Sequence, residues 1–418
     1  MTAAKTRPHA GHPRRDHVLS ARARAGLTPQ RVLENLTAIK PLIAAGAKQA
    51  ERQRVPSRKV WRAIKQSGFL YLTMAKRHGG LEASFDEMLD ATFAICEADP
   101  ATGWLAAFAV MNPRSAAAFS PEAQAEMFEG QTSVVLTSLL SPYGKAVRVP
   151  GGWRVSGTWF WGTTIELADW VSVTAATEGE GVEPALAAFL MPASDAVILD
   201  TWNAHGLIAT GTHKVRVDDA FVPDHRKAAH SMMTAGWMTE IRRQYDYRLF
   251  LGDLAPSLSL TICAPLVGMA RGALALFREH LAAHVRRGAE GTDSEKAPAQ
   301  IRLARAAGMV SASELLLREA ARRIYAHVDA PPEVKDPISL EERGRIAYAA
   351  TLARDAVLYM AEGAGTGVHD LDAPFQQFVR DMVVGSTHVA VDADSNLEAA
   401  GRAMLGLGPV RPKAPRMA

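Results

Sequence analysis

The hydrophobic periodicity of the chain changes twice, and these two changes limit the folds that it can adopt. From Thr28 to about Gly130, apolar residues recur at three- and four-residue spacing, which predicts helices. From about Thr132 to Pro223 the segments are short, rich in Val, Thr and Trp, and separated by Gly, Pro or acidic turns, which predicts a compact β domain. Four helical patterns of 20 or more residues follow, and their broad apolar faces favour a four-helix bundle. The sequence therefore predicts a mainly α protein with a central β domain.

Five parts of the chain follow from these patterns. We expect a disordered basic tail over 1–25, an N-terminal helical domain over 26–130, a middle β domain over 131–232, a C-terminal four-helix bundle over 233–410 and a short tail over 411–418. The first part holds six Lys or Arg residues against one acid and has no apolar run, which is typical of disorder. At roughly 150 residues per domain, a chain of 418 residues fits two or three folded domains.

Charge and cysteine content exclude several classes of protein. The formal net charge of +3 is too small to indicate a nucleic-acid partner. The chain has two cysteines, Cys96 and Cys263, and both lie in apolar helical patterns, so we expect buried reduced thiols. We find neither a secretory signal nor a run of about 20 apolar residues that could span a membrane. The sequence therefore predicts a cytoplasmic protein without a membrane partner.

Several familiar catalytic and binding motifs are absent from the sequence. There is no G-x-x-x-x-G-K-[ST], G-x-S-x-G or C-x-x-C motif, and the glycines at 363, 365 and 367 lack the strand and the spacing of a dinucleotide fingerprint. His280 and His284 stand four apart on an expected helix, but the pattern suggests no third ligand, so we expect no metal site. His205 and His213 flank a turn rich in Gly and Thr, and we expect both at the surface of a hairpin.

Tryptophans cluster in the β region. Trp153, Trp159, Trp161 and Trp170 lie within eighteen residues, and Gly162-Thr163-Thr164 follows the third of them. Core packing is one interpretation. The other is a site for a flat heteroaromatic ligand such as flavin, because small residues with hydroxyl groups let a ring approach the backbone and give it hydrogen bonds. The residues alone leave both interpretations open.

Two further segments carry candidate chemistry. His388 lies in the mostly apolar segment VRDMVVGSTHVAVDAD, with Asp392 one helical turn later on the same face. Such a pair suits a general base that accepts a phenolic proton, with Asp392 orienting the imidazole, and a structural histidine is the alternative. Residues 230–250 combine Trp237 with Arg248, which suits an aromatic substrate bearing an anionic group, or equally a surface linker.

Four strings along the chain resemble the acyl-CoA dehydrogenase superfamily over roughly residues 30–410: GFLYLTMAKRHGG, LTSLLSPYGKA followed by GGWRVSGTWFWGTT, GLIATGTHKVRVDDAFVPDHR, and PFQQFVRD. The resemblance implies that superfamily's fold, with a helical domain, a middle β-barrel-like domain and a C-terminal four-helix bundle. It also implies a flavin pocket in which Trp161 packs on the ring, Thr163 hydrogen-bonds near N5 and takes part in catalysis, and Thr137 and Ser138 face the pyrimidine side. The remaining members of this expected pocket are Trp159 and Thr164.

The branch that the chain resembles most is the oxygenase component of two-component flavin-dependent monooxygenases. The string ADPATGW, which ends at Trp104, and the spacing from Asp381 to His388 carry this resemblance. It implies that reduced FMN or FAD from a separate NAD(P)H:flavin reductase reacts with O2 to a C4a-hydroperoxyflavin, which hydroxylates a phenol-like substrate while His388 acts as the base. Trp104 would line the dry substrate pocket. The resemblance also implies a homotetramer.

Two features keep other activities open. The dehydrogenases of the superfamily carry a catalytic Glu about nine residues after the Arg of PFQQFVRD, where this chain has Val389 and no acid between Met382 and Val391. The missing Glu argues against this activity, but some branches of the superfamily carry their base on a different helix, so an acyl-CoA dehydrogenase-type FAD enzyme is the second candidate. Thr163-Thr164 stands where aromatic hydroxylases usually have Ser-Gly. Because of this difference, an enzyme of the same fold that oxygenates nitrogen or sulfur is a further candidate. The last candidate is a non-catalytic protein that binds no flavin.

Overall fold

The computed structural model describes residues 6–8, 19–128, 133–230, 232, 236–285 and 291–407. The chain forms two compact units, Met1–Leu254 and Ala255–Ala418. Within 1–25, expected to be disordered, the structure has a strand at Thr6–Pro8 and a helix at Ala21–Ala25, which begins where the Ser20 hydroxyl accepts a hydrogen bond from a backbone N–H. Residues 1–5 and 9–18, and the expected C-terminal tail over 411–418, lie outside the described residues.

Three of the longer helices of the first unit begin at residues with the capping chemistry that helices favour. α2 (Pro29–Gln53) and α5 (Pro100–Met111) each start with a proline behind a Thr or Asp cap, and α4 (Phe85–Cys96) starts with a capping box of Ser84 and Glu87. Other helices of this unit are α1 (Ala21–Ala25), α3 (Arg58–Gln66), α6 (Pro113–Ala116), α7 (Pro121–Phe128), α8 (Gly236–Gln244) and α9 (Arg248–Leu251).

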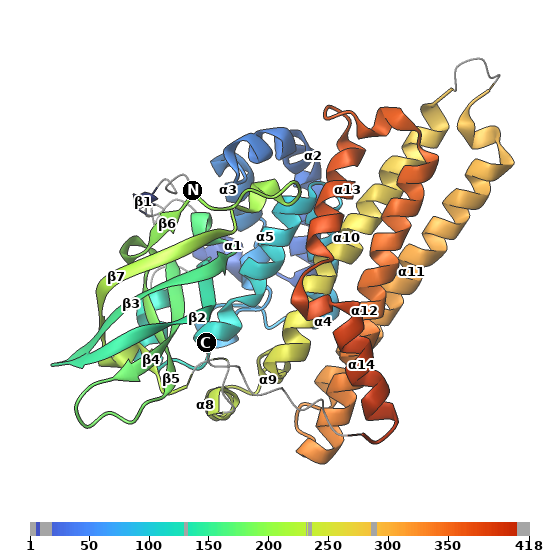
Figure 1. The fold of residues 1–418 in the computed structure, drawn as a ribbon. Helices are drawn as coiled ribbons and strands as arrows, with labels where there is room; N and C mark the ends of the chain where they lie inside the picture. The colour runs from blue at the N-terminus through green and yellow to red at the C-terminus, as the bar shows by residue number, and fades with distance from the viewer. Residues whose placement is uncertain are drawn as a thin grey trace. The chain divides into compact units, whose positions relative to one another are not determined.

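The first unit also contains an eight-stranded sheet with the strand order β1-β6-β7-β3-β2-β4-β5-β8 (Figure 1). β2 and β4 pair in parallel, and the other pairs are antiparallel. The core of the sheet holds Trp153, Trp159 and Phe189 among Val and Ala side chains. The strands are β1 (Thr6–Pro8), β2 (Leu136–Val149), β3 (Gly152–Gly162), β4 (Trp170–Glu178), β5 (Leu186–Pro192), β6 (Val197–Leu199), β7 (His213–Pro223) and β8 (Lys227–Ala228).

A buried ion pair ties the helical part of this unit to its sheet. Lys65, on α3, places its Nζ 3.6 Å from Oδ2 of Asp169, and both side chains are almost fully buried. The same carboxylate oxygen accepts a hydrogen bond from the Val135 N–H at 2.9 Å, just before β2. Because separating the pair would leave an uncompensated charge in the interior, the contact holds the two parts together. The helical and β segments that the sequence separates into two domains therefore lie in one unit.

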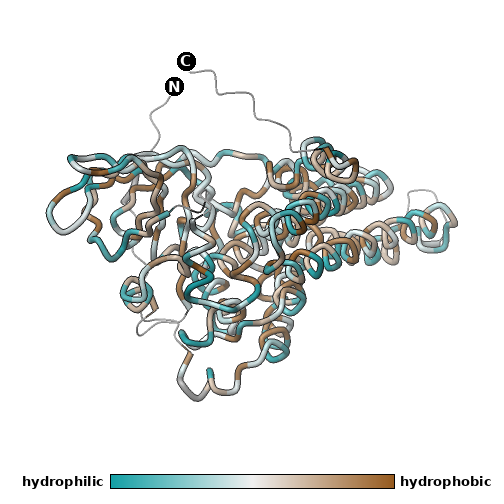
Figure 2. The backbone as a smooth tube through the Cα atoms, turned by 90° about the horizontal axis from the view of Figure 1, so that it is seen from below, coloured by the Kyte–Doolittle hydropathy of each residue, from teal (hydrophilic) through white to brown (hydrophobic). Residues whose placement is uncertain are grey.

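Long helices make up the second unit, and brown and teal alternate along them in Figure 2, as expected for helices with one buried and one exposed face. α10 is long and apolar enough to cross a membrane by length and composition alone, contrary to our expectation, but 78% of its apolar window is buried inside the protein. Its apolar character therefore follows from packing. The helices are α10 (Leu254–Ala283), α11 (Ala297–Ala326), α12 (Pro332–Gly363), α13 (Pro374–Gly385) and α14 (Ala393–Met404).

The last helix of the expected bundle is broken. The sequence predicts one continuous helix where the structure has α13 and α14 as separate helices. Gly385 weakens the helix at this point, and the hydroxyls of Ser386 and Thr387 bond to backbone carbonyls three residues earlier. His388 and Asp392 both fall in the break, as the caps of the short turn η9 (Val389–Val391) and of α14.

Candidate active site

Trp161 lies at the end of β3 with an exposed side chain. Its indole is 68% exposed, and its backbone lies in the left-handed region at φ 63°. A large residue occupies that region at a cost, so its surroundings must hold it there, and strain of this kind clusters at ligand sites. The ring meets the Trp202 ring edge to face, with centroids 6.0 Å apart. An exposed flat ring in a strained, supported position offers a stacking surface to an aromatic ligand.

Hydroxyl groups gather beside Trp161. The Thr163 N–H donates to the Trp161 carbonyl at 2.8 Å, and the Thr163 hydroxyl lies 3.2 Å from that of Thr212, which in turn lies 2.9 Å from that of Thr210. Thr164 is also left-handed, at φ 75°, and its buried hydroxyl lies 2.7 Å from the hydroxyl of Thr137 on β2. These bonds fix the turn that follows β3.

Ser138 supplies an observation that points to a ligand. Its Oγ is buried and has no hydrogen-bond partner among the described residues, although Ser138 directly follows Thr137 on β2. A buried hydroxyl without a partner costs free energy, which a polar atom of a ligand recovers on binding. The exposed Trp161 ring fits the face of a flavin, and the hydroxyls beside it fit the flavin's polar edge. The structure thus brings together five of the expected pocket residues: Thr137, Ser138, Trp161, Thr163 and Thr164.

Trp159 does not belong to this surface. It is fully buried, and its indole N–H donates to the Thr174 carbonyl at 2.9 Å. A ligand cannot reach it, so the prediction that Trp159 binds the cofactor is wrong. In a regular strand, Trp159 and Trp161 would lie on the same face of β3. A register shift between Trp159 and Gly162 turns Trp161 away from that face.

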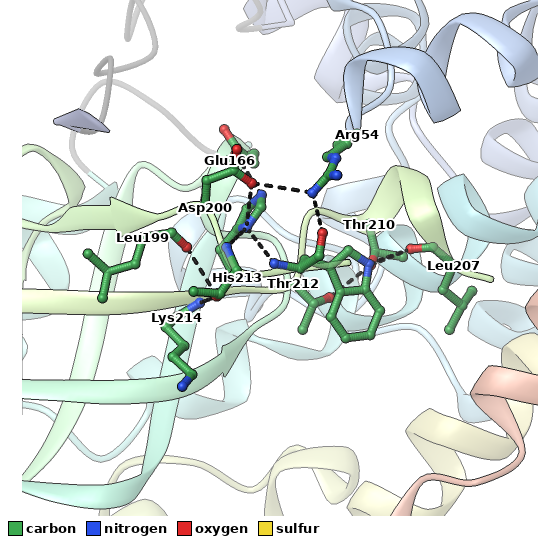
Figure 3. A network of polar contacts seen from close by, with 11 residues as sticks. Arg54, Glu166, Leu199, Asp200, Leu207, Thr210, Thr212, His213 and Lys214 are labelled. Carbon is green, nitrogen blue, oxygen red and sulfur yellow. Dashed lines mark hydrogen bonds and ion pairs between the residues drawn. The ribbon is translucent and has the colours of Figure 1, made fainter. Parts of the chain in front are cut away.

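His213, at the start of β7, is fully buried, and the prediction that it lies at the surface is wrong, whereas His205 is exposed as predicted. The Nδ1 atom of His213 accepts hydrogen bonds from the N–H groups of Thr201 and Trp202, both at 3.1 Å (Figure 3). Because Nδ1 accepts, the neutral ring carries its proton on Nε2, which lies 3.4 Å from Oε1 of Glu166.

The same network holds the Trp202 backbone from its carbonyl side. Arg54 places Nη1 3.3 Å from Oδ1 of Asp200 and also donates to the Trp202 carbonyl (Figure 3). The Trp202 indole N–H donates to the Leu207 carbonyl at 2.9 Å. Trp202 is therefore fixed at three points and supports Trp161 from the side. Our prediction missed four residues of this network: Arg54, Trp202, Thr210 and Thr212. The two threonines lie in the string GLIATGTH, where the hydroxyls are a sequence signal, but no local pattern indicates Arg54 or Trp202.

The three residues expected to contact substrate have different environments. Trp104, on α5, and Trp237, on α8, are buried, and Trp237 packs edge-on against Phe119 with centroids 6.0 Å apart. Neither ring presents a surface to a ligand in this structure, contrary to the prediction. Arg248 begins α9 with an exposed side chain. Of the three, Arg248 is the one with a surface that a ligand could contact.

His388 belongs to the second unit. Burial lowers its pKa from 6.5 to about 4, so the imidazole is neutral at pH 7. Its Nδ1 accepts a hydrogen bond from the Ala390 N–H at 3.1 Å, which places the proton of the neutral ring on Nε2. A neutral ring in this tautomer donates from Nε2, whereas the general base expected from the sequence would have to accept a proton there.

Asp392 has a different role from the one that its spacing suggests. Its carboxylate caps α14 by accepting hydrogen bonds from the Ser395 hydroxyl and, at 3.0 Å, from the Ser395 N–H, and these bonds lower the pKa of Asp392. The prediction that Asp392 orients His388 is wrong, because the helix along which their spacing was counted is broken between them.

Comparisons with known proteins agree with this fold. Residues 260–393 match the family of the acyl-CoA dehydrogenase C-terminal domain. The oxygenase subunit HsaA of a flavin-dependent monooxygenase from Mycobacterium tuberculosis (strain CDC 1551 / Oshkosh) is 30% identical, over 91% of this chain and 96% of its own length. The oxygenase component of an FADH(2)-dependent resorcinol hydroxylase from Rhizobium sp. (strain MTP-10005) is 29% identical, over 91% of this chain and 95% of its own. The structure of XiaF from Streptomyces sp., in complex with FADH2 and glycerol, matches with a TM-score of 0.82 at 26% identity, over 92% of this chain and 97% of that one.

The fold and the site define a flavoprotein of the acyl-CoA dehydrogenase type. Within that class, the chain belongs to the oxygenase components of flavin-dependent monooxygenases. It is therefore an oxidoreductase that uses reduced flavin and O2, and as an oxygenase component it depends on a separate reductase for its flavin and acts on a small molecule.

Proposed function

We propose that this oxygenase hydroxylates a small aromatic substrate with a phenolic hydroxyl group, using reduced FMN or FAD from an NAD(P)H:flavin reductase. The observation that carries the proposal is the exposed, strained indole of Trp161 together with the hydroxyls of Thr163 and Ser138. The Rhizobium relative is named for resorcinol, a phenol, which supports the substrate class. When bound, reduced flavin supplies the electrons that activate O2, of which one atom enters the substrate and the other becomes water.

Residues of the first unit bind the flavin ring in this proposal. The Trp161 indole stacks on the ring, and the hydroxyls of Thr163 and Ser138 hydrogen-bond to its polar edge. Thr137 and Thr164 bond to each other, so they shape the turn and do not contact the ligand directly. The chain of threonine hydroxyls behind Thr163 restrains its rotation, which keeps that hydroxyl available in one direction.

His388 acts on the substrate as a hydrogen-bond donor in this proposal. A group with a pKa of about 4 is too weak a base to take a proton from a phenol, whose pKa is about 10. The phenolic proton is released to solvent water, and the Nε2–H of His388 donates a hydrogen bond to the resulting oxygen anion and stabilises it. The anionic ring is richer in electrons and therefore reacts more readily with an electrophilic oxygen.

An anaerobic stopped-flow experiment tests the flavin assignment. The protein is mixed with reduced FMN or FAD and then with oxygenated buffer, and the return of oxidised-flavin absorbance is followed without substrate. We expect bound flavin to reoxidise more slowly than free flavin, because the site keeps water from it. Reoxidation at the free-flavin rate would contradict the proposal. Reduction of stably bound FAD by an acyl-CoA would instead support the dehydrogenase activity. If ¹⁸O from ¹⁸O2 is found on a nitrogen or sulfur atom of the product, the substrate is an amine or a sulfur compound and not a phenol.

We further propose that the enzyme is a homotetramer in the cytoplasm. Ile301, Gly308 and Leu315 stand seven residues apart on α11 and share one face, where the two large side chains are 65% and 62% exposed. Apart from the neighbouring backbone of α11, no described atom would lie within 4 Å of a side chain's Cβ at Gly308, so this position is open. An apolar stripe of this kind suits packing against another copy of the chain. Cys96 and Cys263 are free and buried, which is consistent with a reducing compartment.

Light scattering on the purified protein checks this assembly. We expect the mass of four chains for the wild type and a lower mass for Leu315→Glu, because a charge in the stripe opposes burial between copies. Val147→Glu changes a residue on β2 that is also apolar and exposed, and it should leave the mass unchanged. A wild-type mass of one chain would contradict the proposal.

A further inference from the structure

α10 and α11 form a helical hairpin (Figure 1). Three side chains of metal-ligating types meet where α10 ends and just before α11 begins. His280 lies in the last turn of α10 and His284 directly follows its end, while Asp293 opens the turn η7 (Asp293–Glu295) just before α11. One ligand atom from each residue lies within 4.8 Å of the other two. The sequence pattern revealed only the two histidines, because the third residue comes from the other side of the hairpin connection.

Hydrogen bonds already order this group. Nδ1 of His284 lies 2.9 Å from Oδ2 of Asp293, and the Asp293 N–H donates to the His284 carbonyl at 2.9 Å. The imidazoles of His280 and His284 stack with centroids 4.7 Å apart and their planes at 21°. Asp293 is 2% exposed, and Lys296 binds its other oxygen, Oδ1, at 3.0 Å. Oδ2 is thereby held toward the histidines, and the buried carboxylate is not free to turn away.

We propose that His280, His284 and Asp293 bind a divalent transition-metal ion, with Zn²⁺ as the best match. Two imidazole nitrogens and one carboxylate oxygen, with water as a fourth ligand, form a donor set that Zn²⁺ accepts, whereas Ca²⁺ and Mg²⁺ prefer oxygen ligands. Ligand atoms of a tetrahedral zinc ion lie about 3.3 Å apart, since its bonds are about 2.0–2.1 Å long.

The observed geometry is close to what the ion requires. The 2.9 Å separation between His284 and Asp293 is near the tetrahedral value, and a side-chain rotation of His280 closes the remaining gap. The bound ion would join the end of α10 to the start of α11 and stabilise the hairpin by mass action. All three ligands belong to the second unit, so this inference does not depend on the flavin-binding proposal.

A direct binding measurement tests the site. The full-length protein, prepared without a histidine tag and stripped of metal by a chelator, is titrated with Zn²⁺ in competition with a chromophoric chelator. We expect one high-affinity ion per chain, and a dissociation constant at least tenfold higher in His284→Gln and in Asp293→Asn. Co²⁺ in place of Zn²⁺ should give the visible absorption of a tetrahedral site, a readout that does not involve enzyme activity.

A matched control uses His369→Gln, because His369 is an exposed histidine of the same unit outside the cluster. That variant should bind Zn²⁺ as the wild type does. The His284 side chain is 40% exposed and contributes little packing, so His284→Gln tests the site even where Asp293→Asn alters the hairpin. Equal Zn²⁺ affinity in the wild type, His280→Gln and His284→Gln would overturn the proposal, and the three side chains would then serve only to hold the hairpin.

Discussion

Replacing His388 by Ala will slow hydroxylation by about 10²-fold or more and leave the binding of reduced flavin almost unchanged. The variant loses the Nε2–H that stabilises the substrate oxygen, so the effect falls on the reaction step. His388 lies in an irregular segment between α13 and α14, so the helices retain their own hydrogen bonds without it. Single-turnover experiments with chemically reduced flavin, O2 and product analysis isolate this step from the reductase.

Two further variants separate the possible roles of this residue. His388→Gln keeps an N–H donor but cannot act as a base, so we expect it to recover most of the activity that His388→Ala loses, whereas a base would leave both variants equally slow. Asp392→Asn is the matched control, because Asn caps a helix about as well as Asp does. Its turnover should equal that of the wild type. Wild-type turnover in His388→Ala would show that His388 does not stabilise the substrate oxygen. Slow turnover in Asp392→Asn would show that Asp392 takes part in the reaction, which contradicts the donor role of His388 and favours a His–Asp base.

The pH dependence provides an independent check on His388. Since its pKa is about 4 rather than 6.5, the ring stays neutral until the pH falls toward 4, and kcat/KM should show no acid limb near 6.5. The unfolded chain binds this proton more tightly than the folded protein does. The free energy of unfolding therefore falls as the pH drops from 6.5 to about 4. A histidine NMR titration compared with His388→Gln measures the pKa, and a value near 6.5 would contradict the role of burial.

The order of helical and β segments was predictable from the sequence, because burial of one face imposes a period on each kind of element. The direction in which individual side chains point was not predictable from the sequence. Strand alternation places Trp159 and Trp161 on one face, but the register shift after Trp159 and the left-handed backbone at Trp161 send one ring into the core and the other toward solvent. A register shift depends on the partner strand, and the sequence of a single segment does not contain that information.

Contacts between distant segments set the same limit elsewhere. Arg54 and Trp202 are 148 positions apart, and no local pattern links them. The prediction that Asp392 orients His388 was wrong for a more local reason. A four-residue spacing places two side chains on one face only where the helix continues between them. Residue types were a better guide than spacing to which side chains lie together. Trp161 and the threonines that follow β3 were proposed from their ring and hydroxyl chemistry, and the structure brings them together.

Removing the Trp161 side chain will weaken the binding of reduced flavin about tenfold, which corresponds to about 1.4 kcal/mol. A stacked aromatic pair contributes about 0.5–1.5 kcal/mol beyond the area that it buries, so loss of the indole accounts for an effect of this size. Trp161→Gly is the sharpest variant, because glycine occupies a φ of 63° without strain. With 68% of the indole exposed, little packing is lost, and the midpoint of thermal unfolding should stay the same or rise.

Anaerobic calorimetric titration with reduced FMN and FAD measures this effect. Trp161→Phe retains a flat ring and should recover most of the affinity. Phe160→Ala is the matched control, since Phe160 is the neighbouring residue on β3, is 39% exposed and has Lys214 Nζ 4.3 Å from its ring centre. Its loss should leave flavin affinity unchanged, because the Phe160 ring packs with Lys214, whereas the Trp161 ring packs with Trp202. Wild-type affinity in Trp161→Gly would mean that the exposed indole does not hold the flavin, and the flavin site would then have to be sought elsewhere on the chain.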